Sequence, residues 1–136
     1  MTNTKKRNLD DLLDSRELHP AIYSSSKTLY IAGQFPQAIF EAAKTLETAI
    51  KNKSGIDRIG QRLINESFPA KLTIRAQHQD EINGAINLFR GFIGYIRNPK
   101  GHVPNYGTID PIRALEWLSF ASVLHRILDE TKLADE

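Results

Sequence analysis

The sequence predicts an all-α protein, a compact bundle of four or five helices. Apolar residues recur every three to four positions over several long segments, which is the spacing of an amphipathic helix. Prolines and glycines stand at the starts and ends of those segments, where helices begin and stop. The chain has 136 residues and no cysteine. One helical core of ordinary domain size is therefore expected, without disulfides to stabilise it.

The chain is expected to form a single domain with a short N-terminal extension. Residues 1–18 are polar apart from a few leucines and predict an arm or a short helix. Residues 19–132 hold no internal repeat, low-complexity tract or linker. We therefore expect one helical domain over 19–132.

The N-terminal half predicts three helical segments. Pro20 suits the first position of a helix, and the apolar spacing after it predicts a helix over about 20–32 that stops at Gly33. From Phe35 the apolar residues keep helical spacing until Gly55, and this is the clearest helix of the chain. A weaker helical pattern follows over about 57–66.

The C-terminal half predicts two long helices joined by a loop. Residues 70–79 could be extended, but one stretch of alternation offers no partner for a sheet. Helical spacing returns over 79–97 and ends at Asn98-Pro99, because a residue before proline is disfavoured in the α region. Asp110-Pro111 then predicts a helix start, and the residues that follow are apolar on two faces, as in a central helix or an oligomer interface. Three glycines interrupt the helix over 79–97 and predict a face that another backbone approaches: Gly84, Gly91 and Gly94.

Several classes of function lack their sequence motifs. No apolar run is long enough to span a membrane and no signal peptide is evident, so a cytoplasmic protein without a membrane partner is expected. Neither a phosphate-binding loop nor a dinucleotide-binding glycine motif is present. The four histidines form no pair at metal-ligand spacing, and cysteine ligands are absent. We therefore expect no metal and no cofactor.

One short block combines residue types suited to phosphodiester chemistry. Arg97 is followed by Asn98 and, after a proline, by His102, within a stretch from 82 to 109 that contains no acidic residue. A guanidinium offers a planar fork of donors to phosphate oxygens and stays charged. An imidazole can take or give a proton near neutral pH. This block therefore predicts an anionic substrate and acid–base chemistry.

RNA is a substrate that these residues could cleave without a metal. Its 2′-hydroxyl supplies the nucleophile, so the reaction needs a base, an acid and stabilisation of the charged phosphorane. One histidine cannot be base and acid in the same concerted step. A two-fold symmetric dimer would bring two copies of the block together and supply both imidazoles.

The same block resembles a known motif. An Arg and a His separated by four to six residues, with a polar residue directly after the Arg, in a small helical protein, is the signature of the HEPN superfamily, whose active members are metal-independent ribonucleases. The chain is also similar to the Ymh-like family of small prokaryotic proteins of unknown function. The segments that carry this likeness are HPAI at 19–22, LYIAGQFPQAIFEAAKTLE at 29–47, RNPKGH at 97–102 and ALEWLSFASVLHRILDE at 114–130.

The resemblance implies a homodimer in which Arg97 and His102 of both protomers line one cleft. Asn98 would position the substrate or His102, and the cleavage products would carry a 2′,3′-cyclic phosphate and a 5′-hydroxyl. Ribonucleases of this superfamily commonly act as toxins or as antiviral abortive-infection effectors. The partners implied are RNA, a second copy of the chain, and an antitoxin or neighbouring defence protein.

Further residues are weaker candidates for substrate binding. Glu41, Lys44 and Glu47 share a polar face of their helix, which by itself predicts a solvated surface with a weak ion pair. The family resemblance adds Glu41 and Lys44 to the candidates. Contacts with flanking phosphates are expected at Lys100 and Arg90, and stacking on a base at Tyr106. Structural positions, at a helix start, in the core or at the surface, are expected for His19, His78, His125 and Tyr95.

Two other functions fit the same residues. A non-catalytic module would use the basic block to bind RNA or a nucleotide and to regulate a partner. A purely structural protein would use the two-faced C-terminal helix to form an oligomer. The ribonuclease is expected to cleave RNA, and the binding module to retain intact RNA with salt-sensitive affinity. The structural protein is expected to be insensitive to replacement of His102.

Overall fold

The computed structural model describes residues 8–97 and 110–134, and these ranges form a helical bundle with one small pair of strands. The all-α class is confirmed. Six helices are present in the described ranges, where four or five were expected, because residues 9–14 form a short helix of their own. No helix in these ranges combines the length and the apolar character that crossing a membrane requires. The elements are α1 Leu9–Asp14, α2 Pro20–Ile31, α3 Phe35–Ser54, α4 Gly60–Ser67, β1 Leu72–Thr73, α5 Gln79–Ile96, α6 Pro111–Glu130 and β2 Lys132–Leu133.

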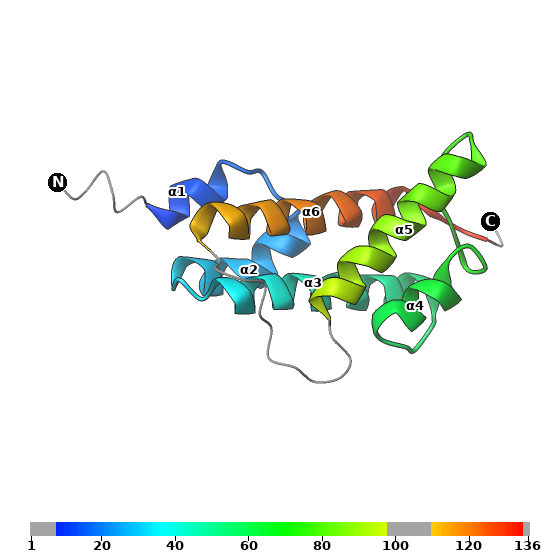
Figure 1. Cartoon of the computed structure of the whole chain (residues 1–136), viewed down its shortest axis with the longest axis horizontal. Coiled ribbons are helices and arrows are strands. Elements are labelled where there is room, and N and C mark those ends of the chain that lie inside the picture. Colours follow the sequence, from blue (N-terminus) through cyan, green and yellow to red (C-terminus); the bar gives the residue numbers. More distant parts are fainter. Residues whose placement is uncertain (1–7, 98–109, 135–136) are drawn as a thin grey trace.

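The central element of the bundle is α3. It packs against α2, α4, α5 and α6. Figure 1 shows α2 and α6 running alongside α3, with α5 crossing them at an angle. Because α3 contacts four helices, its side chains reach several neighbours at once, and the candidate site is built on it.

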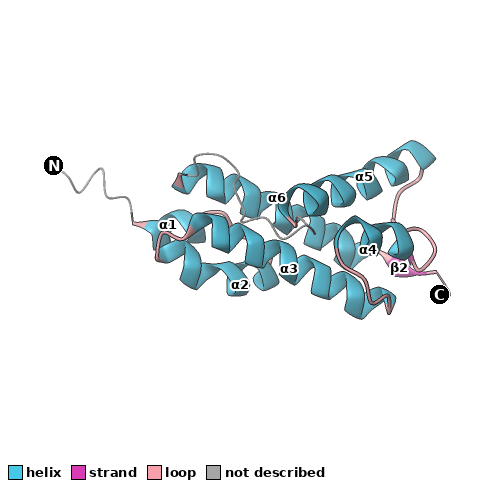
Figure 2. Cartoon of the chain, turned by 60° about the horizontal axis from the view of Figure 1, so that its bottom comes forward, coloured by secondary structure: helices cyan, strands magenta, loops and turns pink. Residues whose placement is uncertain are grey.

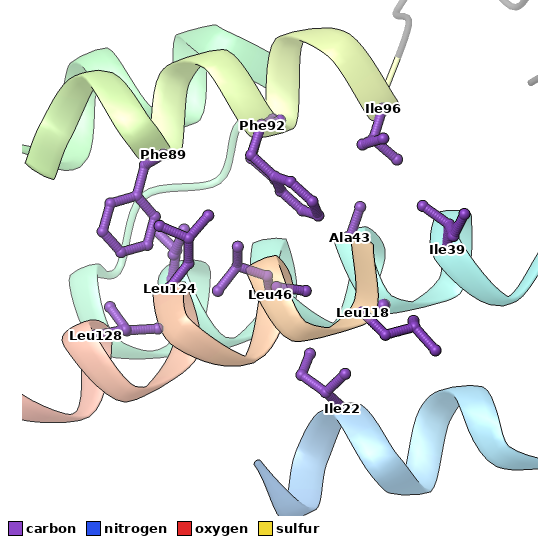
Figure 3. Close-up of a cluster of buried hydrophobic side chains, with 14 of the residues drawn as sticks. Ile22, Ile39, Ala43, Leu46, Phe89, Phe92, Ile96, Leu118, Leu124 and Leu128 are labelled. Carbon is purple, nitrogen blue, oxygen red and sulfur yellow. The ribbon is translucent and has the colours of Figure 1, made fainter. Parts of the chain in front are cut away.

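The core lies where α3, α5 and α6 meet. Figure 3 shows Phe89, Phe92 and Ile96 pointing from α5 toward the other two helices. Full burial of an apolar side chain of this size stabilises the fold by roughly 1.5–3 kcal/mol. This layer therefore fixes the position at which α5 ends. The residues that face it are Ile39, Ala43 and Leu46 of α3 and Leu118, Leu124 and Leu128 of α6.

Local signals set the helix ends as the sequence predicts. The Asp110 side chain accepts a hydrogen bond from the Arg113 backbone N–H (2.7 Å), and Pro111 is the first residue of α6. At the end of α3, Gly55 has a left-handed φ of +77°, which glycine adopts at little cost. Capping and glycine chemistry thus fixed both boundaries in the expected places.

A two-stranded antiparallel sheet is a feature that the sequence did not predict. Leu72 of β1 lies opposite Leu133 of β2, and Thr73 lies opposite Lys132. The prediction that 70–79 lacks a sheet partner is therefore wrong, because its partner follows α6, far along the chain. Figure 2 shows this strand pair at one end of the bundle, beside α4.

The surface of α5 also differs from expectation. A Cβ added at Gly94 would collide with the Gln61 side chain, and one at Gly84 or Gly91 would meet nothing within 4 Å. The predicted approach of another backbone is therefore wrong within the described chain. Tyr95, expected in the core, is 55% exposed. Its ring stacks on that of Trp117 of α6 at the surface of the bundle.

Candidate functional site

Arg97 lies at the C-terminal end of α5, directly after the last helical residue. Its backbone N–H donates to the Ile93 carbonyl (2.8 Å) and closes the helix. The side chain reaches α3, where Nε donates to Glu47 Oε1 (2.7 Å). The guanidinium carbon lies 4.7 Å from the centroid of the Phe40 ring. Together the two contacts hold the planar group in one orientation.

Glu47 is a buried carboxylate, with 3% of its surface exposed. Its Oε2 accepts a hydrogen bond from the backbone N–H of Gly60 (2.6 Å), the first residue of α4, while Oε1 accepts from Arg97. A carboxylate at a helix N-terminus is stabilised by the backbone N–H groups there. This one side chain thus ties α3 to the start of α4 and to the end of α5.

The prediction that Glu47 lies on a solvated face is wrong. Glu47 follows Ala43 by four positions and precedes Ile50 by three, so it continues the buried stripe of α3. A charged residue within an apolar stripe is the sequence signal that could have identified it. Such a charge needs a partner when it is buried, and here the partner is Arg97.

The guanidinium of Arg97 has donors besides the Nε that bonds to Glu47. Its side chain is 20% exposed, so solvent reaches part of it. Within the described residues, hydrogen bonding of this guanidinium involves Nε. The guanidinium also has two Nη groups, and such a fork of donors matches two phosphate oxygens.

Part of the predicted site lies outside the described residues. The roles assigned to those residues stay predictions. The described chain stops at Arg97 and resumes at Asp110, the N-cap of α6. The residues concerned are Asn98, Lys100, His102 and Tyr106.

Arg90 lies two helical turns before Arg97, about 10 Å along the axis of α5 at 1.5 Å per residue. Its Nε donates to Asn65 Oδ1 of α4 (2.8 Å), and Nη1 donates to the Asn87 side chain of its own helix. Both partners are neutral amides, so they orient the guanidinium without neutralising its charge. Arg90 therefore stays a candidate for contact with a flanking phosphate.

The Phe40 ring connects Arg97 with Lys44. The Lys44 ammonium lies 6.0 Å from the ring centroid, and the Arg97 guanidinium contacts the same ring. Lys44 also pairs with Glu41 (3.5 Å between Nζ and Oε2) on the surface of α3. Of the two α3 candidates, Lys44 thus shares a contact with Arg97, and Glu41 is linked to it through Lys44.

A second polar cluster joins α2 to α6. His19 caps α2, as expected for a helix contact, because its Nδ1 accepts from the Ala21 backbone N–H (3.1 Å). Its Nε2 lies 2.7 Å from Asp129 Oδ2, and its ring stacks on that of His125 with centroids 3.9 Å apart. His125 Nδ1 lies 3.6 Å from Asp129 Oδ1 and is a buried nitrogen without a hydrogen-bond partner among the described residues.

The side chains of His19, His125 and Asp129 bring their ligand atoms within 4.8 Å of one another, a spacing that could suit a metal ion. Two features oppose that use. A metal-bound histidine normally donates its other ring N–H, whereas His19 Nδ1 accepts, so a neutral His19 directs its Nε2 proton at Asp129. The stacked rings also lie face to face rather than converging on one centre. The cluster fits a hydrogen-bonded network better than a metal centre.

The environment of His125 keeps this imidazole neutral at pH 7. Burial lowers the pKa of His125 below its ordinary value of 6.5, and the neighbouring His19 lowers it further. The Asp129 carboxylate acts in the opposite direction and does not outweigh them. A neutral imidazole offers one donor and one acceptor nitrogen to its surroundings.

Fold and site together define a small all-helical protein in which a buried acid fixes an arginine at the end of a helix. Residues 16–128 match the model of a family described as a protein of unknown function (Hypoth_ymh), and the chain belongs to that family. No curated protein and no solved structure matches the chain. The match confirms the Ymh-like resemblance and extends from the residues before α2 to the last part of α6.

Proposed function

We propose that the chain is a metal-independent endoribonuclease of the HEPN type that acts as a homodimer. The observation that carries this proposal is the position of Arg97. Its guanidinium is held by the buried Glu47 and by Phe40 at the end of α5, five residues before His102. A charged group that is already oriented needs no reorganisation when negative charge develops on a phosphate.

In the proposed reaction the 2′-hydroxyl of the RNA attacks the adjacent phosphorus, and the bond to the 5′-oxygen of the next nucleotide breaks. A base removes the 2′-hydroxyl proton, and an acid protonates the departing 5′-oxygen. His102 from each of two copies takes one of these roles. Arg97 stabilises the charged phosphorane, and Asn98 positions the substrate. The products carry a 2′,3′-cyclic phosphate and a 5′-hydroxyl.

An exposed apolar face of α5 and α6 supports the dimer. Leu88, Tyr95 and Val123 are 46%, 55% and 52% exposed on these helices, and Tyr95 stacks on Trp117 (5.3 Å between ring centroids). Gly91 lines a hollow of about 200 Å³ together with Leu88, Tyr95 and Trp117, and a Cβ added at Gly91 would meet nothing within 4 Å. Exposed apolar surface of this kind is typical of a protein interface. Because Tyr95 closely precedes the site arginine, two copies joined here would bring their sites toward the two-fold axis.

The biological setting follows from the same proposal. The resemblance to the HEPN superfamily supports a toxin or an abortive-infection effector that acts against phage. An enzyme that cleaves cellular RNA stops the growth of its own host cell. It therefore needs an antitoxin or a neighbouring defence protein that restrains it until infection.

Incubation with mixed RNA in EDTA tests the proposal. We expect cleavage by the unchanged chain and a loss of at least about a hundredfold in His102→Ala, as for removal of a general acid–base group. The paired variant Arg97→Gln/Glu47→Gln is expected to lose activity as well, because it removes the positive charge while leaving no unpaired buried carboxylate. Arg75→Gln and His78→Ala are matched controls, since both residues are exposed and lie at the opposite end of α5.

Other results would separate the alternatives. Cleavage that requires a metal, or that survives both the His102 and the Arg97 changes, contradicts the proposal. Retention of intact RNA with salt-dependent affinity identifies the non-catalytic binding module instead. Tyr95→Glu is expected to be monomeric by light scattering and to lose RNA cleavage in the same assay. Ile31→Glu, a substitution at another exposed apolar residue, is expected to change neither property.

A further inference from the structure

A shallow, open cavity of about 360 Å³ lies between α2, α3 and α6, next to the second polar cluster, and its wall is more apolar than polar. We propose that it binds one ribonucleotide unit of an RNA chain, with base and ribose in the cavity and the phosphate at Lys44. This proposal rests on the ribonuclease function proposed above. The volume lies within the range of roughly 300–1,000 Å³ that is usual for small-ligand pockets. The polar residues that line the cavity are Glu41, Lys44, Thr45, Thr48, Asn52 and His125.

The polar groups in the cavity wall suit the base and the ribose of a nucleotide, which are uncharged and carry several donors and acceptors. The hydroxyls of Thr45 and Thr48 each donate and accept, and the Asn52 amide does both through different atoms. The three residues follow one another at three- and four-residue spacing, so they share one face of α3. Ribose hydroxyls and the edge of a base present the matching mixture of donors and acceptors.

His125 supplies a fixed ring to the cavity. It is 6% exposed and is stacked on His19, which also donates to the carboxylate of Asp129. The unpartnered Nδ1 of His125 lies 3.6 Å from Asp129 Oδ1. A proton on Nδ1 directs that donor at the carboxylate and leaves Nε2 as the acceptor of the neutral ring. Because His125 lines the cavity, its neutral ring is a surface on which a base can pack.

The charges around the cavity disfavour simpler ligands. A free anion would meet the carboxylates of Glu41 and Asp129 against a single ammonium, that of Lys44. A metal ion is opposed by the acceptor role of His19 Nδ1. A nucleotide unit would place its phosphate at Lys44, which would exchange its ion pair with Glu41 for that phosphate, and its base and ribose would lie against the neutral polar groups of the lining.

Lys44 connects the cavity to the Arg97 site. Its side chain lines the cavity, and its ammonium contacts the same Phe40 ring as the Arg97 guanidinium. An RNA strand with one phosphate at Arg97 therefore passes over Phe40 to reach Lys44. The adjoining nucleotide then enters the cavity, where its base and ribose are read. The cavity thus deepens the proposed ribonuclease by giving it a subsite beside the cleavage position.

NMR titration of the intact chain with the four ribonucleoside 5′-monophosphates tests the proposal. We expect the signals of the His125 ring and of the Asn52 side-chain amide to shift in a saturable way with at least one nucleotide. Thr45→Val/Asn52→Ala is expected to bind about tenfold more weakly, the loss typical of one or two hydrogen bonds. The matched control Thr28→Val/Asn83→Ala removes the same groups from exposed positions of α2 and α5 and is expected to bind normally.

Three results would overturn the proposal. Absence of saturable shifts at those signals means that the cavity does not bind nucleotides. Equal shifts with inorganic phosphate alone identify an anion site, and saturation of both histidines by Zn²⁺ without any response to nucleotides identifies a metal centre. RNA cleavage without nucleotide binding here overturns the cavity subsite and leaves the ribonuclease standing. Nucleotide binding without RNA cleavage supports the cavity and contradicts the ribonuclease.

Discussion

Two clusters of this protein pair a basic side chain with a carboxylate, and they do so in opposite ways. At the end of α5 the acid is the buried partner, since Glu47 is 3% exposed and Arg97 reaches it from the surface. Between α2 and α6 the base is the buried partner, since His125 is 6% exposed while the Asp129 side chain is 57% exposed. A buried carboxylate that stays ionised must keep its cationic partner, whereas a buried imidazole can give up its proton and become neutral.

This difference separates a fixed charge from a titratable one. Arg97 does not deprotonate in a protein, so its pair with Glu47 offers the same donors at every physiological pH. His125 changes charge in weak acid, and its hydrogen-bonding role changes with it. The first cluster therefore suits stabilisation of a developing negative charge, and the second suits recognition of neutral polar groups near pH 7.

The largest expected effect is the loss of the buried pair. Arg97→Ala leaves the Glu47 carboxylate in the core without its cation, and removing one partner of a buried pair lowers the free energy of unfolding by about 3–5 kcal/mol. Urea denaturation measures this change. Adding Glu47→Gln to Arg97→Ala is expected to recover part of the loss, because the uncompensated charge is then gone.

An exposed ion pair provides the control for that prediction. Arg113 pairs with Glu116 (2.9 Å) on the surface of α6, and Arg113→Ala is expected to cost at most about 1 kcal/mol. Equal losses in Arg97→Ala and Arg113→Ala would show that Glu47 is solvated in solution. The comparison between a buried acid and a buried base would then have no basis.

The Arg97 cluster also shows which part of a site can be predicted from sequence. The signals for Arg97 are local, namely the end of an apolar helix at Asn98-Pro99 and the absence of nearby acids. Its partner Glu47 lies 50 positions earlier, and the packing of α3 against α5 brings the two together. The position of Glu47 in the apolar stripe was a signal of burial that the prediction of a solvated face missed, and no local pattern indicated which residue would pair with it.

The features of the fold divide in the same way into local ones, which the sequence predicted, and long-range ones, which it did not. Helix ends at Gly55 and Asp110 depend on capping and on backbone conformation within a few residues, so they were predictable. The pairing of β1 with β2 and the contact of His19 with Asp129, 110 positions apart, depend on where whole helices pack. Long-range contacts of this kind are the part that one sequence did not reveal.

A smaller effect is expected in the second cluster. Asp129→Ala removes the acceptor of the His19 Nε2 hydrogen bond, and a hydrogen bond of this kind contributes about 1 kcal/mol to stability. The loss stays small because Asp129 is exposed and water can replace it. Urea denaturation of this variant beside Glu130→Ala, its exposed neighbour, checks the prediction. A loss as large as that of Arg97→Ala would mean that both clusters depend equally on their acids.

The smallest expected effect is a loss of stability in weak acid. Burial, and then the neighbouring His19, lowers the pKa of His125 in the folded chain below 6.5, although Asp129 opposes the shift. The unfolded chain therefore takes up its proton at a higher pH than the folded chain. The free energy of unfolding must then fall as the pH decreases from about 6.5 toward the folded pKa, and must level off above that range. Urea denaturation at a series of pH values from about 8 to about 5 measures this slope.

Variants assign the slope to one cluster or the other. His125→Asn should remove the contribution of this ring, whereas His78→Asn, at an exposed histidine, should leave it in place. Asp129→Ala should steepen the dependence, because it removes a neighbouring charge that favours the protonated ring. Arg97 stays charged throughout this range. The opposite result is a slope that persists in His125→Asn and disappears in Arg97→Gln/Glu47→Gln. It would mean that Glu47, and not His125, changes its protonation in this pH range, which contradicts the prediction.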